Sequence, residues 1–302
     1  MQGEIFKGRC ASARCSALGE LLRHKKGLRV MEVHCPLTAL LIEGMLYSGV
    51  EGEVVFDAFW SSSLVDATLR GKPDTELVEL SSRFSNVSDI FDVTTRPLIF
   101  DADTGGLIEH LPYHVRTAER LGISAFVIED KAGLKKNSLL GNEVLQCQAN
   151  IEEFSKKIAI AIQSRSSPDF MIIARIESLI LDEGMPQALR RSLAYVAAGA
   201  DGIMIHSRQA APDEVLEFAR LFRMHHQNVP LICVPTTYTN IHFDALVLAG
   251  FNVVIYANHM LRAAYPAMSF VAREILKNGC TQKVEQYCLS VKGILELIPG
   301  TS

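Results

Sequence analysis

The sequence contains no long apolar run. Although 48% of its 302 residues are hydrophobic, no uninterrupted apolar stretch approaches the roughly 20 residues that a membrane-spanning helix needs. Residues 1–26 mix acidic and basic side chains and lack the apolar segment of a secretory signal. We therefore expect no membrane partner and a location in the cytoplasm.

A strong excess of charge is also absent. Lys and Arg total 30, Asp and Glu total 34, and the formal net charge is −4. Without a global basic field we expect no nucleic-acid partner. The high apolar content and low net charge exclude disorder for most of the chain.

Cysteine pairs of the kind that bind zinc are missing. The seven cysteines are irregularly spaced and form no C-x-x-C pair, which argues against structural zinc and against a disulfide framework. This usage is typical of a reducing cytosol. We expect the seven to be buried as small apolar residues without a nucleophilic role.

Short apolar runs alternate with segments of helical periodicity along most of the chain. The pattern predicts strands at 27–33, 53–56, 97–100, 125–128, 171–174, 202–205, 230–234 and 253–256. Helices are expected between them, at 36–47, 114–121, 151–163, 185–198, 213–223 and 260–277. Fully apolar strands suit a parallel sheet, and eight β/α units in roughly 250 residues predict a closed (β/α)₈ barrel. The alternative is a doubly wound open sheet, but His34-Cys35-Pro36 stands where that fold carries a glycine-rich turn.

Two segments exceed a minimal barrel. We assign residues 27–279 to the catalytic barrel, 1–26 to a leading segment with a helix, and 280–302 to a C-terminal segment that is helical over 284–297. No Gly/Ser-rich or Pro-rich linker separates them. Extra terminal helices on a barrel usually cap an open end or dock on another subunit.

Carboxylates follow two neighbouring predicted strands. Asp101 and Asp103 come after the third strand and Glu129 after the fourth, at the barrel end where active sites lie. Three carboxylates without interleaved His or Cys favour Mg²⁺ over Zn²⁺. Alternatively, the Asp-x-Asp pair only caps the next turn or helix. Because Mg²⁺ tends to keep several waters, we expect Asp101 to be its nearest protein carboxylate, with Asp103 and Glu129 acting largely through water.

Basic and hydroxyl side chains follow other strands. Arg175 suits a carboxylate or phosphate ligand, or pairs with Glu177 or Glu129 at the rim. His206 is a base, a hydrogen-bond donor to a ligand, or a core histidine. Two long segments at the same end, 60–74 with three serines and 131–141 with three lysines, are either solvated loops or parts of an anion site and a lid.

Together these motifs resemble the phosphoenolpyruvate mutase/isocitrate lyase superfamily over about residues 27–279. The resemblance rests on DADTG at 101–105, EDK at 129–131 followed by NS at 137–138, and the segments 174–177, 205–207, 234–236 and 257–262. The EDK-x₅-NS string is similar to the mutase branch. The lyase branch has a catalytic cysteine where this chain has Lys135-Lys136-Asn137-Ser138.

The resemblance implies a (β/α)₈ barrel, Mg²⁺, and interconversion of phosphoenolpyruvate and phosphonopyruvate, which opens phosphonate biosynthesis. It also implies a homotetramer, built as a dimer of dimers, with the eighth barrel helix swapped between subunits. The implied metal-shell carboxylates are Asp101, Asp103 and Glu129. The implied catalytic residues are Asp74, Asn137, Arg175 and His206, and the implied substrate-binding residues are Trp60, Ser62, Ser63, Leu64, Lys135 and Ser138. Ser63 stands where some members have glycine, which a serine replaces only if φ is negative.

Three other activities stay open. A phosphonopyruvate hydrolase would have the same fold and metal but would admit water, and that branch resembles Thr-Ser where this chain has Asn137-Ser138. A C–C bond lyase would normally carry the loop cysteine. A barrel that only binds an organic anion would leave Asp101, Asp103, Glu129 and Arg175 without use.

Overall fold

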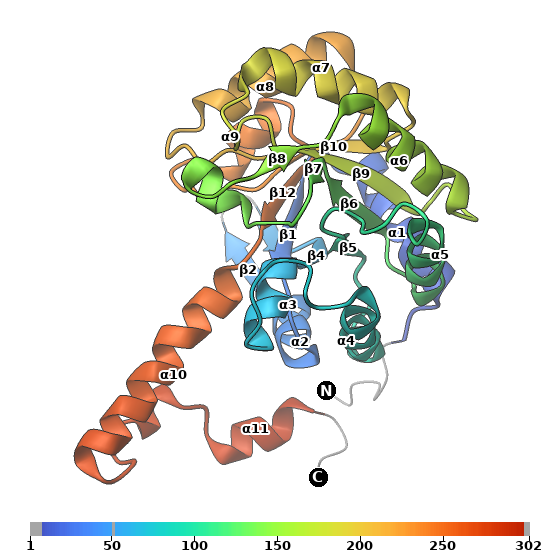
Figure 1. The fold of residues 1–302 in the computed structure, drawn as a ribbon. Helices are drawn as coiled ribbons and strands as arrows, with labels where there is room; N and C mark the ends of the chain where they lie inside the picture. Colours follow the sequence, from blue (N-terminus) through green and yellow to red (C-terminus); the bar gives the residue numbers. More distant parts are fainter. Residues whose placement is uncertain (1–7, 50–51, 299–302) are drawn as a thin grey trace.

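Eight parallel strands close into a barrel in the computed structural model, which describes residues 8–49 and 52–298. Around the barrel the order is β1, β4, β5, β6, β9, β10, β11 and β12, and β12 pairs again with β1. The strands are β1 (Leu28–Glu32), β4 (Ala58–Ser61), β5 (Leu98–Asp101), β6 (Ala125–Glu129), β9 (Met171–Ile176), β10 (Gly202–Ile205), β11 (Leu231–Cys233) and β12 (Val253–Tyr256). The predicted (β/α)₈ barrel is confirmed (Figure 1).

Helices surround this barrel (Figure 1). They are α2 (Pro36–Gly44), α3 (Ser63–Leu69), α4 (Leu80–Val93), α5 (Leu111–Leu121), α6 (Ile151–Ser164), α7 (Gly184–Ala197), α8 (Asp213–His225) and α9 (Phe243–Leu248). Alternate strand residues face the two sides of the sheet. Val30, Ile99 and Ile173 belong to the cluster inside the barrel, whereas Phe100 and Phe126 pack with the surrounding helices.

The predicted second strand is wrong. Residues 53–56 fall largely in β3 (Gly52–Val55), which pairs antiparallel with β2 (Leu46–Gly49) in a hairpin apart from the barrel. The barrel uses β4 instead, whose four residues are all buried, whereas those of β3 are exposed or half-buried. Trp60 therefore lies within a strand, and the helix expected over 36–47 ends at Gly44.

The helix within the leading segment caps the amino-terminal end of the barrel. Helix α1 (Ala11–His24) places Leu18 in the cluster that fills the barrel interior. Its buried Arg14 donates from Nη2 to the carbonyl oxygens of Phe91 at 3.2 Å and Thr94 at 2.8 Å. Extra terminal helices were expected either to cap an open end of the barrel or to dock on another subunit, and α1 caps the barrel.

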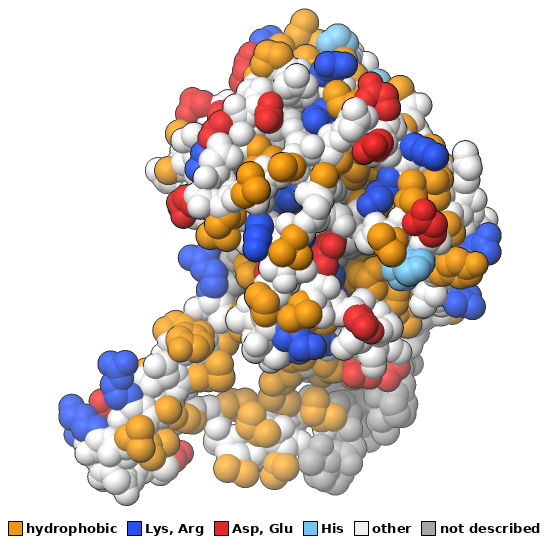
Figure 2. Space-filling view, viewed as in Figure 1, with side chains coloured by type: hydrophobic (Ala, Val, Ile, Leu, Met, Phe, Trp, Pro, Cys, Tyr) orange, Lys and Arg blue, Asp and Glu red, His pale blue; other side chains and the backbone are white. Residues whose placement is uncertain are grey.

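The C-terminal helices leave the barrel. Helix α10 (His259–Asn278) begins where Glu32 accepts hydrogen bonds from the backbone N–H groups of Met260 and Leu261. It then extends away from the body, and none of its residues is buried (Figure 1). A 3₁₀ turn (Glu285–Tyr287) and α11 (Val291–Leu297) follow. Figure 2 shows apolar side chains along this arm.

All seven cysteines are free, but the expectation that all are buried is wrong. Only Cys15 and Cys233 are buried; Cys35 is intermediate, and Cys10, Cys147, Cys280 and Cys288 are exposed. The exposed four lie before α1, in the loop after β6, and in the C-terminal arm, all outside the packed barrel. In residues 8–49 and 52–298, no helix has the length and apolar character needed to cross a membrane.

Candidate active site

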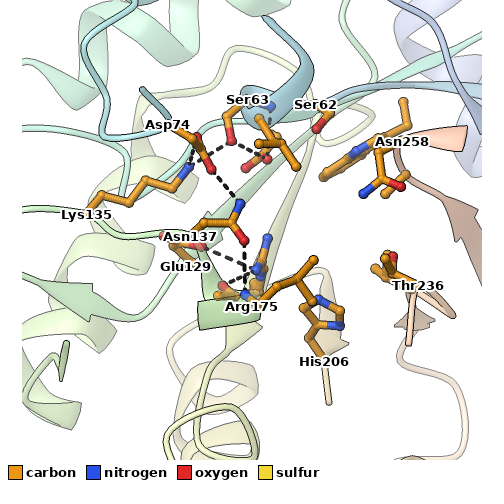
Figure 3. Close-up of a pocket in the computed structure, with 17 residues that line it drawn as sticks. Ser62, Ser63, Asp74, Glu129, Lys135, Asn137, Arg175, His206, Thr236 and Asn258 are labelled. Atoms are coloured by element: carbon orange, nitrogen blue, oxygen red, sulfur yellow. Dashed lines mark hydrogen bonds and ion pairs between the residues drawn. The ribbon is translucent and has the colours of Figure 1, made fainter. Parts of the chain in front are cut away.

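A small cavity of about 50 Å³ lies at the carboxyl end of the barrel strands. Every predicted site residue except Asp103 lines it: Trp60, Ser62, Ser63, Leu64, Asp74, Asp101, Glu129, Lys135, Asn137, Ser138, Arg175 and His206. The cavity is also lined by Leu139, Val234, Thr236, Ala257 and Asn258. Asn258, Thr236 and His206 lie across the pocket from Lys135 (Figure 3).

Strand ends position the central charges. Asp101 and Glu129 are the last residues of β5 and β6, and Arg175 is the penultimate residue of β9, paired in register with Glu129. His206 directly follows β10. Because parallel strands end at one rim, side chains far apart in sequence meet there.

Asp101 is fixed as an ionised carboxylate. Its Oδ2 accepts hydrogen bonds from the Ser63 N–H at 3.2 Å and the Ser63 hydroxyl at 2.8 Å. Burial alone would raise the pKa of Asp101, but Lys135, Arg175 and Arg83 outweigh it and lower that pKa. Ser63 occupies the first turn of α3 and is not among the residues with positive φ. The serine at this position is therefore unstrained.

Asp103 lies behind the pocket. It forms ion pairs with Arg83, at 3.1 Å, and with Lys135. Within the part of the chain that the structure describes, no group of three or more His, Cys, Asp or Glu could hold a metal ion. The expected cluster of three carboxylates is thus not preformed, because cations already engage Asp103. The assignment of these three residues to a metal stays a prediction.

Glu129 is a buried carboxylate that accepts no hydrogen bond from the described residues. Both carboxylate oxygens are buried and lack a hydrogen-bond partner among the described residues. The nearest cations are the Arg175 guanidinium, 3.5 Å away, and the Lys131 ammonium, 3.7 Å away. Burial outweighs both and raises the pKa of Glu129 to about 7. Together with the ionised Asp101, these oxygens, which accept no hydrogen bond from the described residues, fit a hard divalent cation.

Arg175 pairs with a neighbouring carboxylate at the rim and also faces the pocket, so the two alternatives expected for it occur together. Its Nε donates to Glu177 at 2.7 Å, and its Nη2 donates to the Ser138 hydroxyl at 2.6 Å while lining the pocket. His206 also faces the pocket, and its Nδ1 has no protein partner in the described residues. Burial and Arg175 lower the pKa of His206 to about 3. His206 is therefore neutral near pH 7 and suits hydrogen bonding to a ligand.

The segment after β6 forms a closed lid, residues 131–148. It contains a short hairpin, β7 (Lys131–Ala132) with β8 (Cys147–Gln148), and a 3₁₀ segment, η1 (Ser138–Glu143). Lys135 Nζ donates to Asp74 at 2.7 Å and to the Ser63 hydroxyl at 2.8 Å. Asn137 Nδ2 donates to the other Asp74 oxygen at 2.7 Å (Figure 3). The lid and the loop carrying Asp74 therefore close on each other, and the solvated-loop alternative is wrong.

Arg83 is a site residue that the sequence did not reveal. It is fully buried on α4 and donates to the Asp66 carboxylate at 2.7 Å and to the Asp101 carbonyl at 2.6 Å. Its guanidinium also stacks over the Phe100 ring, 4.2 Å from the centroid. An arginine between a serine and a phenylalanine on an amphipathic helix has no pattern that distinguishes it from a surface cation.

Glu76 is a second residue that was missed. It accepts hydrogen bonds from the Thr104 N–H at 2.7 Å and hydroxyl at 2.6 Å, which fastens the Asp74 loop to the loop after β5. Its backbone is left-handed, with φ of 61°. Among the described residues, the non-glycine residues with positive φ are Glu76, Asp103 and Asp182, all acidic and all in loops at the barrel mouth. Left-handed backbone is disfavoured for such residues, and strain of this kind concentrates at functional sites.

A closed barrel with a charged, lid-covered pocket at its carboxyl end defines a (β/α)₈-barrel enzyme. Residues 18–276 match the family model described as phosphoenolpyruvate phosphomutase. The chain belongs to this family.

Relatives with two different names are similar to the chain. Phosphonopyruvate hydrolase of Variovorax sp. (strain Pal2) is 38% identical over 269 residues, which cover 88% of each chain. The crystal structure of phosphoenolpyruvate phosphomutase from Streptomyces platensis subsp. rosaceus matches with a TM-score of 0.85 and 35% identity, covering 96% of this chain and 95% of the other. A phosphonopyruvate hydrolase crystallised with oxalate and Mg²⁺ matches with a TM-score of 0.81 and 34% identity, with the same coverage.

Replacing Glu76 by Ala should loosen the Asp74 loop. The variant loses both hydrogen bonds to Thr104, a loss of roughly 1.5 kcal/mol, so amide hydrogens of residues 70–79 should exchange about tenfold faster. Hydrogen-exchange mass spectrometry measures this directly. Glu76→Gln keeps an acceptor oxygen and should exchange nearly as slowly as the parent; equal exchange in Glu76→Ala and the parent would contradict the fastening role.

Proposed function

We propose that the enzyme interconverts phosphoenolpyruvate and phosphonopyruvate by moving the phosphoryl group between the enol oxygen and C3. The observation that carries the proposal is the closed lid: Asn137 and Lys135 both bind Asp74 across the pocket. Such closure excludes water, which would otherwise capture the phosphoryl group. The reaction would form the carbon–phosphorus bond with which phosphonate biosynthesis begins.

The side chains divide the pocket between the two ends of the substrate. Arg175 and His206, with Asn137 and Ser62, would hold the phosphoryl oxygens during their short transfer. Phosphoryl transfer depends on positioning and charge neutralisation more than on proton transfer. A neutral His206 and a permanently charged Arg175 suit this work, because neither has to exchange a proton with the substrate.

We propose Mg²⁺ as the cofactor, held by Asp101, with Glu129 and Asp103 acting through water. When bound, it would supply Lewis-acid stabilisation of negative charge on the keto-acid oxygens. The support from this chain is the ionised Asp101 together with the buried oxygens of Glu129, which accept no hydrogen bond from the described residues. The positions of Arg83 and Lys135 on Asp103 favour an indirect role for that carboxylate.

Phosphonopyruvate hydrolysis is the second candidate, and the 38% identity to the Variovorax hydrolase favours it. The two reactions would share the barrel, the metal and the pocket, and they differ in whether water reaches the phosphoryl group. A C–C bond lyase is disfavoured because no cysteine stands at residues 135–138 of the lid.

The product formed from phosphonopyruvate distinguishes these activities. With Mg²⁺ present, ³¹P NMR should show the phosphonate signal replaced by the phosphate-ester signal of phosphoenolpyruvate. Inorganic phosphate as the main product would favour the hydrolase. No change in either signal would contradict both and leave a lyase or an anion-binding protein.

Asn137→Ala provides a second arm of the same assay. It removes the hydrogen bond from the lid to Asp74 but no carboxylate. Formation of phosphoenolpyruvate should fall at least tenfold, since a hydrogen bond to a charged group is worth about 1.5–3 kcal/mol. Mg²⁺ binding measured by calorimetry should stay within about twofold of the parent, because no carboxylate is removed. An equal loss of metal binding would contradict the role of Asn137 in the lid.

Two matched carboxylate variants test the metal assignment. Asp101→Asn should abolish turnover even at high Mg²⁺, because it removes the proposed direct ligand. Asp103→Asn keeps one acceptor oxygen, which can serve Arg83 or Lys135 but not both, because the two cations bind different carboxylate oxygens. Its activity should therefore be reduced, and it should partly recover as Mg²⁺ is raised. Steady-state rates over a Mg²⁺ titration provide the measurement, and near-normal activity of Asp101→Asn would overturn the proposed site.

We also propose a homotetramer in which α10 of each subunit packs on the barrel of its partner. Although α10 follows the last barrel strand, none of its residues is buried on its own barrel. Large apolar side chains are exposed on it, including Tyr265, Met268 and Leu276, and Leu37 and Leu41 are exposed on α2. Exposed apolar area of this extent is typical of a subunit interface.

Light scattering should therefore give a mass about four times that of the 33.3 kDa chain. Replacing Tyr265 and Met268 together by Asp should dissociate the assembly, because charge would enter the proposed interface. Lys277→Ala, a surface change on the same helix, should leave the mass unchanged. A monomeric parent protein would contradict the proposed packing of α10 on the barrel of a partner subunit.

A further inference from the structure

The lid is held at its outer end as well as at the pocket. Asn142, in η1, donates from Nδ2 to Asp182 Oδ2 at 2.8 Å. Asp182 lies between β9 and α7, and the same oxygen accepts a hydrogen bond from Arg208, which lies between β10 and α8. One carboxylate oxygen therefore joins the lid to two loops of the barrel mouth. Asp182 and Arg208 keep side-chain exposures of 50% and 29%, and neither lines the pocket.

The backbone at Asp182 is unfavourable for the residue that occupies it. Its φ is 57°, in the left-handed region where a Cβ is disfavoured. Glycine would adopt this conformation without strain. The contacts of the Asp182 side chain that offset this backbone cost are those to Asn142 and Arg208.

The lid backbone is fitted closely to this anchor. Gly141 has φ of 49° and ψ of −132°, which kinks η1 next to Asn142. A Cβ added at Gly141 would lie 2.7 Å from Arg208 Nη1. The Arg208 guanidinium thus lies between the lid backbone and Asp182, a fit that an opened lid would lose.

The outer and inner ends of η1 are only a few residues apart. At the inner end, Asn137 binds Asp74, and the Ser138 hydroxyl donates to Glu177 at 2.5 Å. At the outer end, Asn142 binds Asp182. Because Asn142 follows Asn137 and Ser138 closely along the chain, fixing Asn142 also restricts where these two residues can lie over the pocket.

We propose that Asp182 is a positioning residue that keeps the lid closed and so favours phosphoryl rearrangement over hydrolysis. The preference for rearrangement rests on the proposed function, whereas the effect on the lid does not. In the rearrangement, the C3–P bond of phosphonopyruvate breaks and a P–O bond forms to the enolate oxygen of the same molecule. With the lid loosened, the oxygen of a water molecule forms the P–O bond instead. The products are then phosphate and pyruvate, and C3 gains a proton.

Two variants of Asp182 separate this role from a general structural one. Asp182→Asn removes the charge and tolerates left-handed backbone, and Asp182→Gly also relieves the strain. We expect lid residues 133–146 of the full-length protein to exchange amide hydrogens at least fivefold faster in Asp182→Gly. The increase should be smaller in Asp182→Asn, which loses the charge but keeps an acceptor oxygen for Asn142 and Arg208. The melting temperature of Asp182→Gly should equal or exceed that of the parent, which a merely structural role would not produce.

The product ratio is the second readout. In ³¹P NMR of phosphonopyruvate turnover with Mg²⁺, the ratio of phosphate to phosphoenolpyruvate should rise at least fivefold in Asp182→Gly and by less in Asp182→Asn. Asn142→Ala should give a rise similar to that of Asp182→Gly, and the combination of the two should add little, because both remove the same contact. Glu217→Gln removes a carboxylate from the surface pair with Arg220 on α8 and should change neither readout.

Unchanged lid exchange in both Asp182 variants would overturn the proposal, whatever products form. Faster exchange with an unchanged product ratio would overturn the part concerning water. If the parent itself makes only phosphate, the proposed mutase function fails. In that case, amide hydrogen exchange of the lid residues still tests whether Asp182 holds the lid closed. Faster exchange in the variants supports this role, and unchanged exchange overturns it.

Discussion

Buried cations at the barrel mouth must be neutralised by buried carboxylates, and the rest of the site is arranged around this requirement. Arg83 and Lys135 are each at most 4% exposed and are surrounded by acidic side chains. Removing one member of such a group leaves the opposite charge buried without a partner, which is strongly destabilising. Arg83 therefore does more than fill space under α4: it fixes Asp66 at the start of α3 and the loop that carries Asp101 and Asp103.

The same electrostatics couple the lid to the pocket. Lys135 is buried, which by itself would lower its pKa, but Asp103, Glu129, Asp101 and Asp74 together raise it. The lysine stays charged and is attracted to the most acidic part of the barrel mouth. Closure of the lid is therefore driven by charges that also shape the substrate site, and a variant at one of these carboxylates alters lid position and ligand binding together.

The sequence predicted those parts of the site that strand order alone determines. Asp101, Glu129 and Arg175 end buried parallel strands, so the barrel brings them together without further information. The hairpin of β2 and β3 was mistaken for a barrel strand because its valines resemble a buried run, although β4 supplies the buried face. Arg83, Glu76 and Asp182 could not be recognised, because their roles depend on tertiary contacts and on backbone conformation that no periodicity encodes.

Family relatives named for rearrangement and for hydrolysis both match this chain over most of its length. A barrel rim of Asp101, Glu129 and Arg175 provides charge neutralisation that either reaction needs, so it cannot by itself choose between them. What differs is access of water, and access is governed by loops rather than by strands. The strained acidic residues of this chain lie in those loops: Glu76 fastens the Asp74 loop and Asp182 contacts the lid. Selectivity in such a fold can therefore change through loop anchors that lie outside the pocket, while the charges at the strand ends stay the same.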